Sequence, residues 1–314
     1  MTLLVAITGW DPAPWAERFR KLMPDRRVVT LGEPYDGADI RYVASWKHPP
    51  RSLANLPHLK ALLSLGAGVD HLFSDPALPD APIVRIVDPD LTARMSEYVV
   101  LHCLLHLRQQ RRYDHQQRNR QWVDDRLQPA ARDMRVGILG MGELGQDAAR
   151  KLALMGFQVA GWSRSSKRST DAEMFCGADE LDLFLQRTDI LVALLPLTRD
   201  TRGFINATLL RKLAHDGPFG GPYLINAGRG GLQVESDILA CLNDGTLLGA
   251  ALDVFEQEPL PPSSPLWPHP AVTITPHNAA MSDPETIGKQ VVAQIQDFES
   301  GAPLRNIVDR DRQY

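Results

Sequence analysis

Three glycines at a fixed spacing stand between an expected buried strand and an expected helix. Apolar residues 136–139 lead into Gly140-x-Gly142-x-x-Gly145, and an apolar pattern of helical period follows. Gly140 permits a tight turn, Gly142 lets the backbone approach a pyrophosphate, and Gly145 allows the helix to pack closely on the strand. The helix N-terminus offers free N–H groups and a positive dipole end to the phosphates. The junction predicts a dinucleotide-binding loop, and a glycine-rich turn without a ligand explains it poorly.

The end of the next expected strand, at Trp162, indicates which dinucleotide is bound. About 20 residues beyond the glycine loop, NAD-binding units usually place Asp or Glu against the ribose 2′-hydroxyl. This chain has Ser163, Arg164 and Ser165 there, followed closely by two more basic residues. No carboxylate stands there to repel a 2′-phosphate, and a guanidinium with two hydroxyls can bind one. The turn favours NADPH, with NADH possible, and its alternative interpretation is a solvated basic turn.

Short apolar runs alternate with helical patterns along most of the chain, which is typical of parallel sheets covered by helices on both faces. A first set of expected strands comprises residues 3–7, 28–31, 42–44, 61–65 and 83–87. A second set comprises residues 136–139, 159–162, 190–195, 223–226, 250–254 and 272–275. The glycine loop opens the second set, so the first set forms another domain. The expected fold class is α/β, with two Rossmann-like doubly wound parallel-sheet domains.

The last apolar segment, residues 285–300, has helical spacing of Ile287, Val291, Val292, Ile295 and Phe298. We expect this helix to pack back onto the N-terminal domain, which makes that domain discontinuous. The expected substrate-binding domain comprises residues 1–98 and 284–314, and the expected NAD(P)-binding domain comprises residues 99–283. In open α/β sheets, ligands bind beyond the carboxyl ends of the strands. The active site is therefore expected in the cleft between the two domains.

Bulk composition excludes several classes of protein. The 314 residues suit two domains of moderate size, and the 44% that are hydrophobic suffice for substantial cores. The net charge of −4 provides no field that would attract nucleic acid or an anionic membrane. No signal peptide or transmembrane segment is expected. Cys103, Cys176 and Cys241 lack metal-ligand spacing and are expected to be buried thiols in a reducing cytoplasm.

Polar groups stand directly after three late strands of the second set, where parallel strands place their carboxyl ends at one edge. They are Asn226-Ala-Gly-Arg229-Gly230, Asp253-Val-Phe-Glu-Gln-Glu258-Pro259-Leu260 and Thr275-Pro-His277-Asn-Ala-Ala280. These signatures resemble those of the D-2-hydroxyacid dehydrogenases. The resemblance covers essentially the whole chain, from the loop at residues 65–70 to the C-terminal helix. Residues 46–50, 162–165 and 252–261 look most like the glyoxylate/hydroxypyruvate reductase A branch of that family.

The resemblance implies that Arg229, Glu258 and His277 form a catalytic trio, and the chemistry of these side chains fits. Reduction of a 2-keto acid needs a hydride, a proton for the carbonyl oxygen and a holder for the carboxylate. His277 suits the proton donor because imidazole exchanges protons near neutral pH. Glu258 would orient the ring through its other nitrogen and favour the imidazolium form. Arg229 would fork between the substrate carboxylate and the keto oxygen.

Taken singly, each residue of the trio has a structural alternative. His277 could be a hydrogen-bonded histidine at a strand end, Arg229 a helix-capping surface arginine, and Glu258 an ordinary loop carboxylate. Their joint occurrence in the order of the family, on a chain with a dinucleotide loop, favours the catalytic interpretation. The remaining histidines lack a comparable setting and are expected to be structural: His48, His58, His71, His102, His106, His115, His215 and His269.

The expected substrate-binding residues are Trp46, Ala67, Gly68 and Met95, together with Arg229 and His277. The turn at residues 66–68 can offer backbone N–H groups to the substrate carboxylate. The resemblance implies that the loop of Trp46 covers the substrate and selects small keto acids, although a lone aromatic residue at a strand end is also typical of a core or an interface. The expected cofactor-binding residues are Gly140, Met141, Gly142, Glu143, Leu144, Gly145, Ser163, Arg164, Ser165, Leu195, Pro196, Ala227, Gly228, Arg229, Asp253, His277 and Ala279.

The main hypothesis is an NADPH-dependent reductase that converts glyoxylate to glycolate and hydroxypyruvate to D-glycerate. One alternative is a family member that reduces another 2-keto acid or uses NADH, and a second is a non-catalytic NAD(P)-sensing regulatory protein, against which the intact trio argues. The resemblance implies a homodimer, joined by a helix that begins near Ser96 and by an arm at residues 118–129. Trp122 is an expected interface anchor in this arm and could line the partner's active site. The Arg-rich residues 108–120 are expected to continue the helix of residues 98–107.

Overall fold

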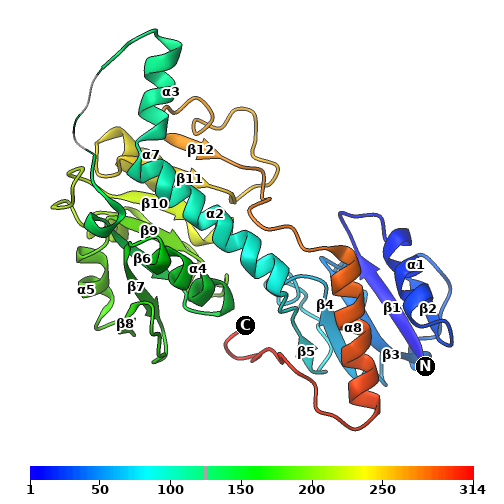
Figure 1. Ribbon diagram of the computed structural model, residues 1–314. Coiled ribbons are helices and arrows are strands. Elements are labelled where there is room, and N and C mark those ends of the chain that lie inside the picture. The colour runs from blue at the N-terminus through cyan, green and yellow to red at the C-terminus, as the bar shows by residue number, and fades with distance from the viewer. Residues whose placement is uncertain (124–125, 127) are drawn as a thin grey trace. The chain divides into compact units, whose positions relative to one another are not determined.

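The computed structural model describes residues 1–123, 126 and 128–314, and this part of the chain forms two compact units (Figure 1). Unit 1 comprises residues 1–91 and 282–314, and unit 2 comprises residues 92–281. The chain thus leaves unit 1 after residue 91, somewhat earlier than the division expected after residue 98. It returns after residue 281, close to the division expected after residue 283.

Unit 1 is built on a parallel sheet of five strands in the order β2-β1-β3-β4-β5. The order of the strands reverses between β1 and β3, and ligands of open α/β sheets bind outside the carboxyl ends of the strands at such a switch point. The strand bounds are β1 (Thr2–Ile7), β2 (Arg27–Thr30), β3 (Ile40–Trp46), β4 (Ala61–Ser64) and β5 (Ile83–Val84).

Two helices from opposite ends of the sequence, α1 (Ala13–Leu22) and α8 (Pro284–Glu299), cover one face of this sheet side by side (Figure 1). Asp283 caps the N-terminus of α8, because its carboxylate accepts hydrogen bonds from the first free N–H groups. Ile287, Val291 and Ile295 are buried against the sheet and against α1. The helix expected at residues 285–300 is confirmed, and it completes the core of unit 1.

Unit 2 contains a parallel sheet of seven strands in the order β12-β11-β10-β9-β6-β7-β8, whose switch point lies between β6 and β9. The expected doubly wound architecture is therefore confirmed for both sheets. The strands are β6 (Arg135–Leu139), β7 (Gln158–Ser163), β8 (Glu173–Cys176), β9 (Ile190–Ala193), β10 (Tyr223–Asn226), β11 (Gly249–Leu252) and β12 (Val272–Ile274). The helices around them are α4 (Glu143–Leu154), α5 (Leu181–Gln186), α6 (Ala207–Leu210) and α7 (Glu235–Asn243).

The helices before this sheet differ from expectation. Helix α2 (Pro89–Leu107) begins at Pro89, two turns before the expected start near Ser96. The Arg-rich stretch does not continue α2, because Gln109 adopts a left-handed conformation with φ 52° and a separate helix, α3 (Gln110–Arg118), follows it. None of the residues of α3 is buried. In the arm expected at residues 118–129, Trp122 is 98% exposed, and residues 124, 125 and 127 lie outside the described residues.

Composition led to expectations about membrane-spanning helices and about the three thiols. Among the residues that the structure describes, no helix combines the length and apolar character needed to cross a bilayer. Cys103 and Cys241 are buried free thiols, as expected, whereas Cys176 is only half-buried at the edge strand β8. The expectation that all three thiols are buried was therefore wrong for Cys176.

Candidate functional site

The glycine loop joins β6 to α4 at the switch point of the unit 2 sheet. Gly140 has a φ of 103°, and a Cβ there would come within 2.8 Å of the backbone of Leu194. A Cβ on Gly145 would collide with the carbonyl oxygen of Gly140, so the helix packs closely on the strand. A Cβ on Gly142 would meet nothing within 4 Å, which leaves the space that a pyrophosphate needs beside the start of α4. These residues fit a dinucleotide.

The turn after β7 carries the residues expected to recognise the 2′-phosphate. Ser163 is 7% exposed, and its hydroxyl donates a hydrogen bond to the carbonyl oxygen of Ser165 at 2.8 Å, so it shapes the turn. The guanidinium of Arg164 pairs with Asp200 at 3.1 Å, and both side chains are largely exposed. An exposed ion pair of this kind contributes only about 0–1 kcal/mol. The pair with Asp200 therefore opposes the binding of a phosphate by Arg164 only weakly.

Lys167, a basic residue that follows the turn expected to bind the 2′-phosphate, reaches the glycine loop. The ammonium group of Lys167 donates a hydrogen bond to the carbonyl oxygen of Met141 at 2.8 Å. The two residues are 26 positions apart, and no local pattern marks such a contact. Lys167 thus ties the turn after β7 to the loop that fits the pyrophosphate and adds a positive charge between them.

His277 and Glu258 lie together, as the resemblance implied. Nδ1 of His277 is 2.7 Å from Oε2 of Glu258, and the side chains are 41% and 30% exposed. The other carboxylate oxygen of Glu258 accepts the backbone N–H of Phe255 at 3.1 Å, which fixes the carboxylate. Within the described part of the chain, Nε2 of His277 makes no hydrogen bond. The ring is therefore oriented through one nitrogen while the other can meet a ligand.

The backbone of His277 is held in an uncommon conformation. Its φ is 52°, and its N–H is shared between the carbonyl oxygens of Asp253 at 2.8 Å and Thr275 at 3.1 Å. Such a conformation costs a non-glycine residue on the order of 1–3 kcal/mol and persists only where the surroundings hold it. The buried carboxylate of Asp253 does so, because it accepts hydrogen bonds from the hydroxyl of Thr275 and from the N–H groups of Asn278 and Ala279 at 2.6–3.0 Å.

Tyr98 of helix α2 supports the same loop. The hydroxyl of Tyr98 is 2.9 Å from that of Thr275, and burial raises the pKa of Tyr98. The ring of His102 lies 4.2 Å from that of Tyr98, and burial lowers the pKa of His102 to about 4, so this histidine is neutral and structural. A hollow of about 260 Å³ borders Tyr98 and Asn278. The contribution of Tyr98 was not predicted, because its partner is 177 residues away.

Arg229 is positioned by a buried amide network. Asn226 donates to the side-chain oxygen of Gln233 at 2.8 Å, and Gln233 donates to the carbonyl oxygen of Val254 at 2.9 Å. A Cβ on Gly230 would collide with the backbone of Phe255, so the turn after β10 packs directly on the loop after β11. Arg229 is half-buried on this turn, and its Nη1 donates to its neighbour's carbonyl oxygen at 2.9 Å.

Several other expected residues of unit 2 are mainly buried. Leu195 and Ala227 are 8% and 5% exposed and follow β9 and β10, next to the switch point, while Pro196 and Gly228 are half-buried beside them. Met95 is 7% exposed and packs in the core with Tyr98 and Met141. The structure thus places Met95 in the packing beneath the loops rather than on their surface.

In unit 1, the expected substrate-binding residues lie together at the carboxyl ends of β3 and β4. The ring of Trp46 stacks on Trp10, with centroids 4.9 Å apart and planes 7° apart, and His71 lies tilted against it at 4.7 Å. A Cβ on Gly66 would collide with the ring of Trp46. Trp46 therefore lies directly against the turn that contains Ala67 and Gly68. The stacking partner Trp10 was not predicted.

Comparison with known proteins agrees with this geometry. Residues 100–279 match the D-isomer specific 2-hydroxyacid dehydrogenase, NAD binding domain. Glyoxylate/hydroxypyruvate reductase A of Yersinia enterocolitica is 40% identical over 280 residues, which make up 87% of this chain and 87% of that protein.

Solved structures extend the similarity to the whole chain. An NADPH-dependent glyoxylate/hydroxypyruvate reductase from Sinorhizobium meliloti, in complex with NADP and sulfate, has a TM-score of 0.93 and 51% identity over 100% of this chain and 99% of that chain. A probable 2-hydroxyacid dehydrogenase from Rhizobium etli, in complex with NADP, HEPES and L(+)-tartaric acid, has a TM-score of 0.94 and 45% identity with the same coverage. The glycine loop, the His277–Glu258 pair and these similarities lead to one conclusion: the chain belongs to the D-isomer specific 2-hydroxyacid dehydrogenase family, and it is an oxidoreductase.

Proposed function

We propose that this enzyme reduces small 2-keto acids with NADPH, converting glyoxylate to glycolate and hydroxypyruvate to D-glycerate. The contact between His277 and Glu258, which orients a histidine whose Nε2 is free to meet a ligand, carries the proposal. This pair stands in the same unit as a loop that fits a dinucleotide. The activities named for the relatives from Y. enterocolitica and S. meliloti support the choice of substrates and of NADPH.

The proposed roles rest on the chemistry of the side chains and, for His277 and Glu258, on their contact. When bound, NADPH supplies the hydride that reduces the keto carbon. His277 delivers a proton from Nε2 to the keto oxygen, while Glu258 holds the ring through Nδ1. Arg229 binds the substrate carboxylate and polarises the keto group. Ala67 and Gly68 bind the carboxylate with their N–H groups.

The test is the oxidation of NADPH at neutral pH with glyoxylate, hydroxypyruvate, pyruvate and a bulky aromatic 2-keto acid. We expect kcat/KM to be highest for glyoxylate and hydroxypyruvate. A higher kcat/KM for the bulky acid would show that the enzyme prefers larger 2-keto acids to the proposed substrates. Tight binding of NADPH without turnover of any of the four acids would indicate a cofactor-sensing protein instead.

The cofactor preference rests on the turn after β7. Arg164 and Lys167 provide positive charge there, and position 163 is a serine rather than an aspartate or glutamate. A charge-assisted contact with the 2′-phosphate contributes about 1.5–3 kcal/mol, or about one to two decades in affinity. We therefore expect kcat/KM to be at least about tenfold higher with NADPH than with NADH. Ser163→Asp combined with Arg164→Ala should shrink or invert this ratio, because the first adds repulsion and the second removes attraction.

Salt and a matched variant provide controls for this prediction. Raising the ionic strength should increase KM for NADPH more than KM for NADH, because only NADPH makes the exposed ionic contact. Arg211→Ala, at an exposed ion pair with Asp244 in the same unit, should leave the ratio unchanged. Equal use of both cofactors by the unmodified enzyme would contradict the assignment of the turn.

We also propose a homodimer that uses helix α2 and the arm after α3. Trp122 is 98% exposed and Leu101 on α2 is 51% exposed, and a large exposed tryptophan is a typical interface anchor. Light scattering at working concentration is expected to give twice the mass of the chain, and Trp122→Ala should weaken the association. A monomer at micromolar concentration would rule the dimer out.

A further inference from the structure

Lys47 adopts a backbone conformation that its residue type disfavours. It follows β3 directly, at the carboxyl end of the strand and at the switch point between β1 and β3. Its φ is 48°, in the left-handed region, where residues other than glycine are uncommon. Strain of this kind persists only where the surroundings impose it, and it concentrates at ligand sites. Contacts on two sides hold Lys47 in this conformation.

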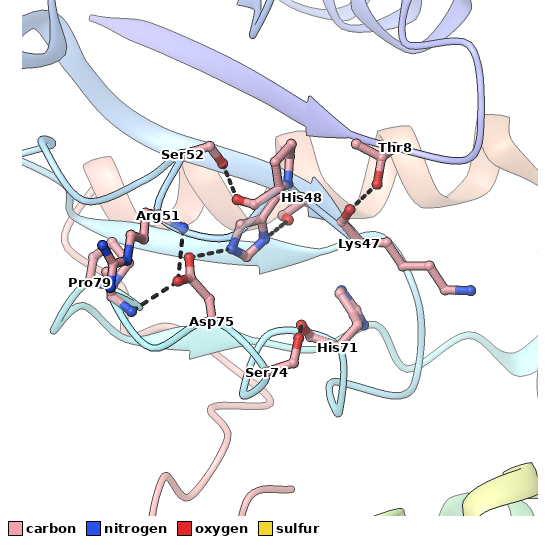
Figure 2. A network of polar contacts seen from close by, with 12 residues as sticks. Thr8, Lys47, His48, Arg51, Ser52, His71, Ser74, Asp75 and Pro79 are labelled. Carbon is pink, nitrogen blue, oxygen red and sulfur yellow. Dashed lines mark hydrogen bonds and ion pairs between the residues drawn. The ribbon is translucent and has the colours of Figure 1, made fainter. Parts of the chain in front are cut away.

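Strand β1 holds the residue from one side. The N–H of Thr8 donates to the carbonyl oxygen of Trp46 at 3.0 Å, and the hydroxyl of Thr8 donates to the carbonyl oxygen of Lys47 (Figure 2). The carbonyl groups on both sides of the strained φ/ψ pair are therefore anchored to Thr8, the residue that directly follows β1.

A buried side-chain network holds it from the other side (Figure 2). Nε2 of His48 is 3.0 Å from the carboxylate of Asp75, and Nδ1 is 2.9 Å from the hydroxyl of Ser45. Burial lowers the pKa of His48, so the ring is neutral. Because a carboxylate can only accept, Nε2 donates to Asp75, and Nδ1 accepts from Ser45. Asp75 also accepts the N–H of Arg51 at 2.9 Å, which closes the loop of residues 47–51 onto the same carboxylate.

The side chain of Lys47 points away from this network (Figure 2) and is exposed. Its ammonium group lies 5.7 Å from the ring centroid of Trp46, within the range of a cation–π interaction. Within the described residues, no carboxylate pairs with it. Trp46 in turn lies against Gly66, in the turn proposed to bind the substrate carboxylate. A loop that is anchored on both sides thus presents a positive charge at the edge of the sheet where that turn stands.

We propose that Lys47 is a substrate-binding residue whose ammonium group attracts and holds the carboxylate of the 2-keto acid. This inference rests on the proposed function and assigns to unit 1 a charged group in addition to the N–H groups of Ala67 and Gly68. Lys47 contributes to substrate affinity alone, because neither the proton nor the hydride passes through it. The network of Ser45, His48 and Asp75 serves to keep the charge in place.

The test compares Lys47→Gln, which removes the charge and keeps a flexible polar side chain, with Lys47→Arg, which keeps the charge. Lys47→Gln is expected to raise KM for glyoxylate about fivefold to 20-fold, with kcat and KM for NADPH within about twofold of the unmodified enzyme. Lys47→Arg should stay within about threefold in every constant. In about 0.5 M NaCl, the difference in KM for glyoxylate between the unmodified enzyme and Lys47→Gln should become smaller, because salt screens an exposed charge.

Lys21→Gln is the matched control, because Lys21 is an exposed lysine of unit 1 whose ion pair with Glu17 lies within α1. Lys21→Gln should change neither kcat nor KM for glyoxylate or NADPH. An unchanged KM for glyoxylate in Lys47→Gln, or an equal rise in Lys47→Arg, would refute the role of the charge while leaving the proposed reaction intact. Calorimetric titration with oxalate provides a readout without turnover, in which Lys47→Gln should weaken Kd by a similar factor. If the unmodified enzyme reduced no keto acid, the proposed reaction would fail, and an unchanged Kd for oxalate would refute Lys47 separately.

Discussion

Replacing His277 with alanine is expected to lower kcat by about 10²-fold to 10⁴-fold, because general acid catalysis by a positioned side chain is typically worth that much. KM for NADPH should change little, since the ring is needed in the transition state rather than in binding. The φ of 52° at this position would strain alanine as well. His277→Asn is therefore the better second variant, because asparagine tolerates the left-handed region and cannot deliver the proton.

Two further variants separate chemistry from structure. His215→Ala, at an exposed histidine of the same unit, should leave kcat unchanged. Glu258→Gln should lower kcat less than His277→Asn does, because the amide oxygen can still accept a hydrogen bond from Nδ1 and orient the ring, whereas His277→Asn removes the proton donor itself. If either His277 variant kept more than about half of the activity, His277 would have no place in the mechanism.

Arg229→Ala is expected to raise KM for the keto acid and to lower kcat, so that kcat/KM falls by about 10²-fold to 10⁴-fold. One guanidinium is proposed to bind the carboxylate and to polarise the keto group, and each charge-assisted hydrogen bond contributes about 1.5–3 kcal/mol. Steady-state kinetics with glyoxylate measure both constants, and NADPH fluorescence shows whether the cofactor still binds.

Arg229→Lys tests the geometry of this interaction. Lysine keeps the charge but cannot form a fork, so KM should recover more than kcat does. Arg211→Ala again serves as the control at an exposed arginine. If Arg229→Ala left KM and kcat unchanged, the role of Arg229 as the holder of the substrate would be untenable.

The parts of the fold that were predicted from sequence are those with local signals. Buried parallel strands are nearly continuous apolar runs, so the strand expected at residues 223–226 coincides with β10. The loop at Gly140 was recognisable for the same reason, because its three glycines lie within six consecutive positions. In contrast, β8 at residues 173–176 has only three apolar residues after a glutamate, and as a half-buried edge strand it was not predicted.

The start of α2 shows a different limit. Its first two turns mix the polar residues Asp90, Arg94 and Ser96 with only two large apolar residues, Leu91 and Met95, whereas apolar residues become dense from Tyr98 onward. The break at Gln109 left no trace in the sequence, because a left-handed glutamine is imposed by the structure around it rather than by its residue type.

The sequence provided candidate members of the site, but not the contacts that hold them. The order of Arg229, Glu258 and His277 along the chain follows the strand ends, and strand ends meet at one edge of a parallel sheet. The hydrogen bonds that fix them join distant positions, such as Thr275 to Tyr98 and Lys167 to Met141. Side-chain contacts of this range depend on the folded backbone, and no periodicity or motif encodes them.

The discontinuity of unit 1 sets an order of events during synthesis on the ribosome. Residues 1–91 emerge first, but the sheet they form stays incomplete on one face until α8 supplies Ile287, Val291 and Ile295. The whole of unit 2 is translated in between, which takes about 10–40 s at usual elongation rates. During that interval the nascent N-terminal segment exposes apolar surface that chaperones recognise, while unit 2 has every strand it needs to fold. Cotranslational folding is therefore expected to finish in the middle of the chain before it finishes at the beginning.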